Sequence, residues 1–248
     1  MTVTIDTGTD ELLCSIEDRV ATITLNRPEK KNALSDNLTP ALRQTLLELN
    51  TAQEVGCIVI TGAGKAFCAG GDVSGMGGKP AEQVESTPPS VQDRVKALQH
   101  KQETLTLRLF EHAKPTVAAL PGPAVGAGMC IALACDIRVG SESAFIGTGY
   151  RNVGFSGDYG GSWLLTKLVG VAKAKELFFT GRRVLAEECQ RLGIFNQVVP
   201  DDKLEEATLE LARQIADGPP IALGYMKENL NRAIDMNLRD CLAMEADR

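Results

Sequence analysis

Residues 60–72 read ITGAGKAFCAGGD, and they extend an apolar, β-branched run, CIVITG, that occupies residues 57–62. A continuous run of this kind is typical of a strand buried on both faces of a sheet. Glycines follow the strand at once. The same pattern returns where PTVAAL (115–120) leads into PGPAVGAGM (121–129). The two segments predict two buried strands that each end in a turn rich in Gly and Ala.

These turns have the chemistry of a main-chain binding site. Small residues let a ligand approach the backbone, and amides at a helix N-terminus are unpaired donors with a favourable dipole. One amide from each turn can converge on a single developing oxyanion, an interaction worth roughly 3–4 kcal/mol per donor in known enzymes. The alternative is that the glycines only permit tight turns and close packing, and their spacing alone leaves both interpretations open.

Composition excludes several classes of partner. The 248 residues carry a net charge of -6, and 44% are hydrophobic. Nucleic acid and anionic membranes both require clustered positive charge, so we expect neither as a partner. The N-terminal segment lacks a basic stretch followed by an apolar core, and no apolar run approaches ~18 residues, so we expect a cytoplasmic protein without membrane spans. The 7 cysteines are odd in number and lie mostly in apolar runs, which predicts reduced core residues.

The remaining pattern predicts a single α/β domain over residues 1–248. We expect an α/β core to about residue 195 and a helical C-terminal extension over 196–248. A loop or lid is predicted between Gly75 and Ser90. The other elements are predicted from their periodicity: strands at 18–26, 136–140 and 144–147, and helices at 35–52, 91–112, 129–135, 160–169, 171–180, 186–192, 202–216 and 219–234.

Other chemistries fail on inspection. GAGK at 62–65 lacks the earlier glycine and the following Ser or Thr of a P-loop, and no GxGxxG follows a strand. The chain has two histidines, and we interpret His112 as a surface residue at a helix end and His100 as solvent-facing. Clusters of metal ligands and a GxSxG elbow are missing. We therefore expect neither metal nor cofactor, and acid–base chemistry falls to carboxylates or tyrosine.

The favoured carboxylate is Asp158, in VGFSGDYGGS at residues 153–162. Its glycine and apolar neighbours can desolvate it, and desolvation raises the pKa of an Asp toward that of a useful base. The alternative is that Asp158 caps a helix beginning near Gly160. The residues alone leave both roles open.

Four segments together resemble the crotonase family of enoyl-CoA hydratases and isomerases. They are LNRPEKKNAL (25–34), ITGAGKAFCAGGD (60–72), PAVGAGMCIALACD (123–136) and the GG-S-LL-LVG pattern (160–170). The resemblance covers nearly the whole chain, in the family's order and spacing. It implies a crotonase-like spiral of ββα units, a homotrimer or a dimer of trimers, and an acyl-CoA thioester substrate of the kind found in fatty acid metabolism, with CoA entering as part of that substrate.

The resemblance also implies site residues. The two amides that hold the thioester carbonyl map to Gly71 and Ala127, where Ala127 replaces a common glycine but keeps the amide. Ala69 and Asp72 correspond to positions beside the CoA moiety, and Lys30 or Lys31 is a candidate partner for a CoA phosphate. The same comparison adds further substrate-binding residues: Ala33, Gly70 and Tyr150. It also leads us to expect a C-terminal region one helix shorter than that of most relatives.

The chain differs from the family pattern at the positions of the catalytic acids. Hydratases of the family add water with two glutamates, and those positions align with Cys130 and Tyr150, neither of which activates water as a carboxylate does. Asp158 aligns instead with an acidic residue of dienoyl-CoA and ring-opening epoxide isomerases. A relative that dehalogenates aromatic CoA esters uses an Asp there as nucleophile, but its active-site histidine aligns near Glu103.

These observations favour an isomerase in which Asp158 transfers a proton. One alternative is a hydratase in which Asp158 acts with a bound water, helped by Tyr150 or Glu103. A second, of another class, is an acyl-CoA binding protein without catalysis.

Overall fold

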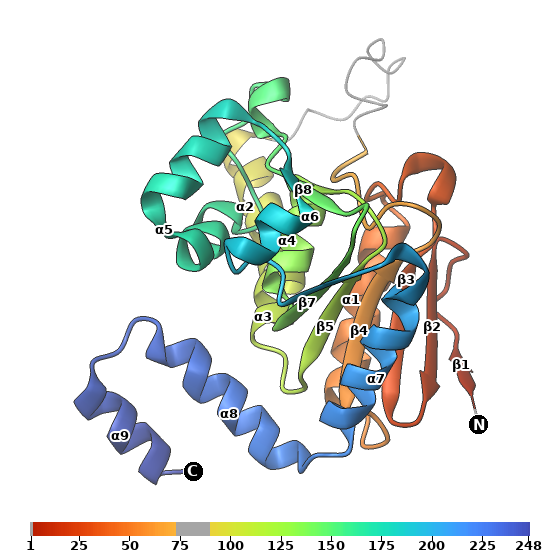
Figure 1. Cartoon of the computed structure of the whole chain (residues 1–248), viewed down its shortest axis with the longest axis vertical. Coiled ribbons are helices and arrows are strands. Elements are labelled where there is room, and N and C mark those ends of the chain that lie inside the picture. The colour runs from red at the N-terminus through yellow and green to blue at the C-terminus, as the bar shows by residue number, and fades with distance from the viewer. Residues whose placement is uncertain (1, 73–89) are drawn as a thin grey trace.

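The computed structural model describes residues 2–72 and 90–248, and it confirms the predicted α/β class (Figure 1). A seven-stranded sheet has the order β1-β2-β3-β4-β5-β7-β10, and a three-stranded sheet has the order β6-β8-β9. In the large sheet β1, β2 and β3 pair antiparallel, and every pair from β3 to β10 is parallel. The loop predicted between Gly75 and Ser90 lies outside the described residues except for Ser90, which caps α2.

The strands are short, and ten are described in the two ranges: β1 (Val3–Ile5), β2 (Leu12–Glu17), β3 (Val20–Leu25), β4 (Cys57–Gly62), β5 (Thr116–Leu120), β6 (Ala124–Val125), β7 (Ile137–Ser141), β8 (Phe145–Gly147), β9 (Val184–Leu185) and β10 (Gln197–Val199). The α-helices of the described ranges vary widely in length: α1 (Leu38–Thr51), α2 (Val91–Gln102), α3 (Arg108–Phe110), α4 (Ala127–Ala134), α5 (Gly161–Thr180), α6 (Ala186–Arg191), α7 (Leu204–Ala216), α8 (Pro220–Ala233) and α9 (Leu238–Ala246).

Strand β4 shows why the large sheet forms. Its alternate residues enter two separate cores: Ile58 and Ile60 pack with the apolar stripe of α1, while Cys57 and Val59 pack with Ala212 of α7. Figure 1 places α1 and α7 on opposite faces of the sheet. Burying an aliphatic side chain contributes about 1.5–3 kcal/mol. The prediction of a strand buried on both faces is confirmed.

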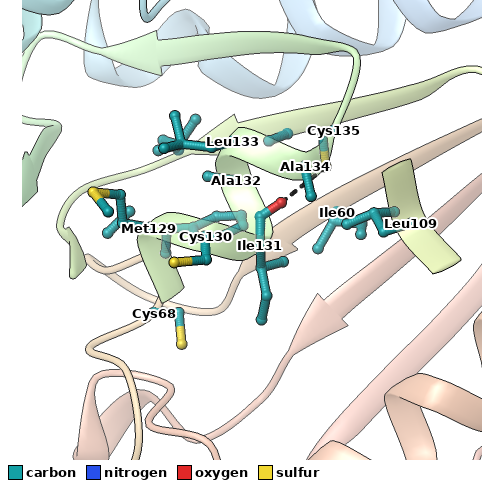
Figure 2. Close-up of a cluster of buried hydrophobic side chains, with 14 of the residues drawn as sticks. Ile60, Cys68, Leu109, Met129, Cys130, Ile131, Ala132, Leu133, Ala134 and Cys135 are labelled. Atoms are coloured by element: carbon teal, nitrogen blue, oxygen red, sulfur yellow. Dashed lines mark hydrogen bonds between the residues drawn. The ribbon is translucent and has the colours of Figure 1, made fainter. Parts of the chain in front are cut away.

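Helix α4 is buried at all eight of its residues, as its lack of a polar face predicts. Figure 2 shows Ile60 of β4 and Leu109 of α3 together on one side of it, and Cys68 near Cys130 on another. The thiol of Cys135 donates back to the carbonyl of Ile131, at 3.5 Å. The helix is therefore fixed on all sides, and its N-terminus is held in one place.

Two helix predictions meet different outcomes. The break predicted between helices at 160–169 and 171–180 is confirmed, because Gly170 lies within α5 at φ 77° and ψ 159°. The single helix predicted over 91–112 is wrong in detail: a π-helical turn, Glu103–Leu107, separates α2 from α3. Such turns insert one extra residue into a helix and are frequent at functional sites.

The C-terminal region is mostly helical, but its first elements, β10 and α7, belong to the large sheet and its covering layer. Strand β10 pairs with β7, and Ala212 and Ala216 of α7 are buried against the sheet. Helices α8 and α9 follow and extend away from the sheet (Figure 1). The described helices include none with the length and apolar character needed to cross a membrane.

Candidate active site

The two glycine-rich turns lie side by side because their backbones are paired. Cys68 and Ala124 form a parallel bridge, in which Val125 donates to the carbonyl of Cys68 at 2.9 Å. The amides of Phe67 and Cys68 both donate to the carbonyl of Pro123, at 3.0 and 3.1 Å. The segments at 60–72 and 121–129 thus form one unit, although residues 73–120 separate them in the chain.

This pairing places Gly71 next to the start of α4. Leu34 donates to the carbonyl of Gly70 at 2.8 Å and accepts from Asp72 at 3.1 Å, so the amide of Gly71 between them points away from Leu34. A Cβ built on Gly70, which has φ +93°, would lie 3.6 Å from the amide nitrogen of Ala127. Ala127 is the first residue of α4, where the amide has no partner within the helix. The two amides predicted to hold an oxyanion are therefore neighbours.

Gly128 explains how α4 approaches so closely. A Cβ at this position would lie 2.3 Å from the carbonyl oxygen of Cys68 and 2.7 Å from its Cβ. Every other residue type carries that Cβ, so the contact requires glycine. Close packing and amide presentation are thus two results of the same glycine-rich sequence.

Asn32 is a residue of this site that sequence reasoning missed. Its side chain is fully buried and bridges two turns: Nδ2 donates to the carbonyls of Ala63 and Ala66 at 2.9 and 2.7 Å, and Oδ1 accepts from the amide of Arg27 at 2.9 Å. Its backbone is left-handed at φ 56°, a conformation that asparagine tolerates better than most residues. An Asn inside the 25–34 motif was the available signal.

Several of the substrate-binding residues predicted from the resemblance lie in the segments around Asn32. The carbonyl of Lys31 accepts from the amide of Ala69 at 3.0 Å, and the carbonyl of Ala33 accepts from Nη1 of Arg27 at 2.6 Å. Asp72 forms an ion pair with Arg27 at 3.1 Å. Lys30 and Lys31 are exposed, as a phosphate partner must be.

Cys130 and Tyr150, which the resemblance aligns with the two hydratase glutamates, touch each other. The Sγ atom of Cys130 lies 3.1 Å from the Oη atom of Tyr150, and both groups are buried. Burial raises the pKa of the Cys130 thiol to about 12, and it also raises the pKa of Tyr150. At neutral pH both groups are protonated and uncharged.

The backbone carbonyl of Asp158 contacts both members of this pair. The capping alternative is wrong: α5 begins after Gly160, no side-chain cap is formed at its start, and the Oδ1 atom of Asp158 is buried without a hydrogen-bond partner among the described residues. Burial raises the pKa of the Asp158 carboxyl, and the neighbouring Tyr150 hydroxyl partly offsets that rise. A desolvated carboxyl with an unpaired oxygen is suited to accept and return a proton.

A cavity of about 350 Å³ lies between α2, the π-helical turn and the start of α5, and the residues that follow Asp158 in the chain line it. Tyr159, the residue after Asp158, forms part of its wall together with Trp163 and Phe110. The amide of Tyr159 donates to Oε1 of Gln102 at 2.7 Å, which ties the loop to α2. Glu103 also lines the cavity, but its side chain accepts from Gln99 at 2.8 Å on the exposed face of the helix.

The histidines lie outside this site. His100 is exposed, as predicted. The prediction that His112 is a surface residue is wrong: its side chain is 2% exposed, Nδ1 accepts from the amide of Lys114 at 3.1 Å, and Nε2 lies 3.1 Å from the carbonyl of Leu46. Since Nδ1 is the acceptor, the proton resides on Nε2 and is donated to Leu46. The helix end is covered by α1, which local sequence does not reveal.

His112 predicts a pH dependence of stability. Burial lowers the pKa of His112 from 6.5 to about 4, so the unfolded state binds more protons than the folded state between these values. We expect the free energy of unfolding to fall as the pH drops from about 6.5 to 4, by at most about 3 kcal/mol from this residue. Urea unfolding at pH 7 and pH 4.5 measures it. His112→Gln should lose that part of the decline, and an unchanged decline in the variant contradicts the prediction.

Comparisons with known proteins agree with the geometry. The family model described as enoyl-CoA hydratase/isomerase matches residues 15–248. The chain is 34% identical to a 1,2-epoxyphenylacetyl-CoA isomerase of Escherichia coli, over 95% of this chain and 87% of the relative. It is also 34% identical to a short-chain-enoyl-CoA hydratase of Clostridium acetobutylicum, over 93% and 85%, and to a 4-chlorobenzoyl coenzyme A dehalogenase of Arthrobacter, over 92% and 80%.

The fold agrees as well. The crystal structure of an enoyl-CoA hydratase from Bacillus anthracis superposes with a TM-score of 0.84 at 31% identity, covering 96% of this chain and 89% of that one. The predicted fold class is confirmed by this likeness. Relatives named for three different reactions are each 34% identical to this chain. Sequence identity therefore does not distinguish between these reactions, and the residues of the site must.

Proposed function

Since this chain belongs to the enoyl-CoA hydratase/isomerase family, we propose that it is an acyl-CoA enzyme that moves a double bond by proton transfer through Asp158. The observation that supports this most directly is the buried, unpaired Oδ1 atom of Asp158 beside a Cys130–Tyr150 pair that lacks a carboxylate. Water addition by two glutamates has no counterpart among these residues.

In this proposal the backbone amides of Gly71 and Ala127 bind the thioester oxygen. The Asp158 carboxylate removes a proton from the carbon next to the thioester of a 3-enoyl-CoA. The C–H electron pair moves into the conjugated system, and the oxygen becomes an oxyanion held by the two amides. The Asp158 carboxylic acid then returns the proton to the far carbon. The product is the 2-enoyl-CoA, and Asp158 is a carboxylate again.

We also propose the CoA-binding residues. The exposed Lys30 or Lys31 meets a phosphate of CoA, and the turn of Ala33, Ala69 and Gly70 follows its pantetheine arm. Support comes from the hydrogen bond between Lys31 and Ala69, which makes these residues neighbours. Asp72 completes the turn through its ion pair with Arg27.

A homotrimer, alone or paired into a dimer of trimers, is the proposed assembly. Helices α8 and α9 expose large apolar side chains that a monomer leaves in water, since Ile221, Leu230 and Leu238 are each at least 70% exposed. Large apolar side chains gathered on exposed helices favour a contact site between subunits.

A panel of thioesters tests the reaction. The purified protein is incubated with 2-enoyl-, 3-enoyl- and dienoyl-CoA in heavy water, and the products are identified by mass spectrometry. We expect the 3-enoyl or dienoyl substrate to give an isomer with the same skeleton, which carries deuterium at the far carbon only to the extent that the proton held by Asp158 exchanges with the solvent before it is returned. Product heavier by one water identifies a hydratase in which Asp158 acts with a bound water, as the relative from Clostridium suggests. Tight binding without product identifies an acyl-CoA binding protein.

A further inference from the structure

Three groups from different parts of the chain meet at the backbone carbonyl of Asp158. The Oη atom of Tyr150 donates to this oxygen at 3.3 Å, and the Sγ atom of Cys130 lies 3.5 Å from it. With the 3.1 Å contact between Sγ and Oη, the three atoms form a closed triangle. The amide of Gly161 also donates to this oxygen, at 3.0 Å. A carbonyl oxygen has two lone pairs, so the Tyr150 hydroxyl and the Cys130 thiol share the acceptor site that the amide leaves.

Resting on the proposed function, we propose that Cys130 and Tyr150 are a positioning pair: they hold the carbonyl of Asp158 and thereby aim its carboxyl at the substrate. The pair binds the backbone of Asp158 and leaves the carboxyl oxygen Oδ1 unpaired for the reaction.

The pair also links Asp158 to the amides at the start of α4. Cys130 follows Ala127 by three residues, so both lie on one face of α4. The Oη atom of Tyr150 reaches α5 as well, because a Cβ at Gly161 would lie 3.5 Å from Oη and 2.8 Å from Sγ of Cys130. The distance from the carboxyl to the oxyanion position therefore depends on this contact.

The loop before α5 needs such an anchor. Residues 151–156 are exposed, and left-handed backbone recurs at Gly154, Gly157, Tyr159 and Gly160. A glycine-rich loop of this kind has many accessible conformations that must be excluded. Its anchors include the triangle at Asp158, the bond from the amide of Tyr159 to Gln102 and the bond from Arg151 to the carbonyl of Thr180.

The absence of charge in the pair is part of its role. A carboxylate in either position would face the carbonyl oxygen of Asp158 as a second acceptor and would repel it. A protonated thiol and phenol are donors, and burial keeps both protonated by raising their pKa values. The residues that replace the two hydratase acids thus exchange water activation for the placement of one remaining acid.

Tyr150→Phe is the first test, because the ring can stay stacked on Phe178, whose centroid is 5.9 Å away. We expect kcat to fall about 10- to 100-fold, as for a misplaced reacting group, while KM stays within about threefold. Since the Tyr150 hydroxyl lowers the pKa of Asp158, its loss should move the acidic limb of the kcat/KM profile to higher pH. Tyr225→Phe, on α8, is the matched control and should change neither quantity.

Cys130 gives an independent test. Cys130→Ser keeps a donor and should retain most of the activity, whereas Cys130→Ala should resemble Tyr150→Phe. Cys189→Ala removes another buried thiol, which contacts the carbonyl of Val184, and controls for loss of core packing. The double variant of Cys130→Ala and Tyr150→Phe should lose less than the product of the single losses, because the two groups act on one carbonyl.

The outcomes separate this inference from the proposed function. If Asp158→Asn keeps full turnover, the proposed function fails. If Asp158→Asn loses turnover but Tyr150→Phe keeps both kcat and the acidic limb, only the positioning pair is overturned. A loss in Tyr150→Phe that matches its loss of folded protein by circular dichroism, with an unmoved acidic limb, also overturns it.

Discussion

Asp158→Asn is expected to lower kcat by about 10²–10⁴-fold, the contribution of a positioned acid–base group, and to leave the affinity for a CoA thioester within a few-fold. The amide has nearly the same shape as the carboxyl but cannot take a proton from carbon. Turnover of the substrate identified in the thioester panel measures kcat, and calorimetric titration with a saturated acyl-CoA measures affinity. In the parent enzyme the acidic limb of kcat/KM should lie above the usual range of an aspartate, since burial raises the pKa of Asp158.

Asp235→Asn is the matched control. This carboxyl is exposed and pairs with Lys167 on the surface, so its replacement should leave kcat unchanged. Full turnover in Asp158→Asn contradicts the role of Asp158 as the base. A large loss of thioester affinity with little change in kcat assigns the residue to binding instead.

The second large effect is expected at Gly128. Gly128→Ala places a Cβ 2.3 Å from the carbonyl oxygen of Cys68. Because the clash is with a backbone atom and not with a flexible side chain, either α4 or the turn at Cys68 must move. Either movement separates the amides of Gly71 and Ala127. Loss of one oxyanion donor costs about 10²–10³-fold in kcat, and we expect a decrease of that order in turnover of the same substrate.

Gly56→Ala separates this effect from simple instability. Its Cβ would lie 2.6 Å from the carbonyl oxygen of Ala216, a similar clash at the end of α7 and away from the glycine-rich turns. Both variants should lower the free energy of unfolding, which chemical denaturation measures. Only Gly128→Ala should lower kcat per folded molecule. Equal kcat values in the two variants would show that the start of α4 need not be held so closely.

Much of the fold follows from local sequence. The run CIVITG has no polar face, so it has to be covered on both sides, and α1 and α7 cover it. The glycine at position 170 interrupts α5 where the pattern predicts a break. Strand β10 escapes prediction because it is short and only partly buried, and its identity depends on pairing with β7.

The sequence by itself determined the two glycine-rich turns, because close backbone approach depends on the absence of a Cβ, as at Gly128. The resemblance to a known family then pointed to the candidate amides. The sequence also pointed to Asp158, but tertiary structure alone decided which groups surround it and the turns. Asn32, His112 and the triangle at Asp158 all depend on hydrogen bonds between groups that lie far apart in the chain, as when Asn32 meets Ala66 and His112 meets Leu46. A polar side chain shows in the sequence what it can donate or accept, but burial and a partner appear only when the chain has folded.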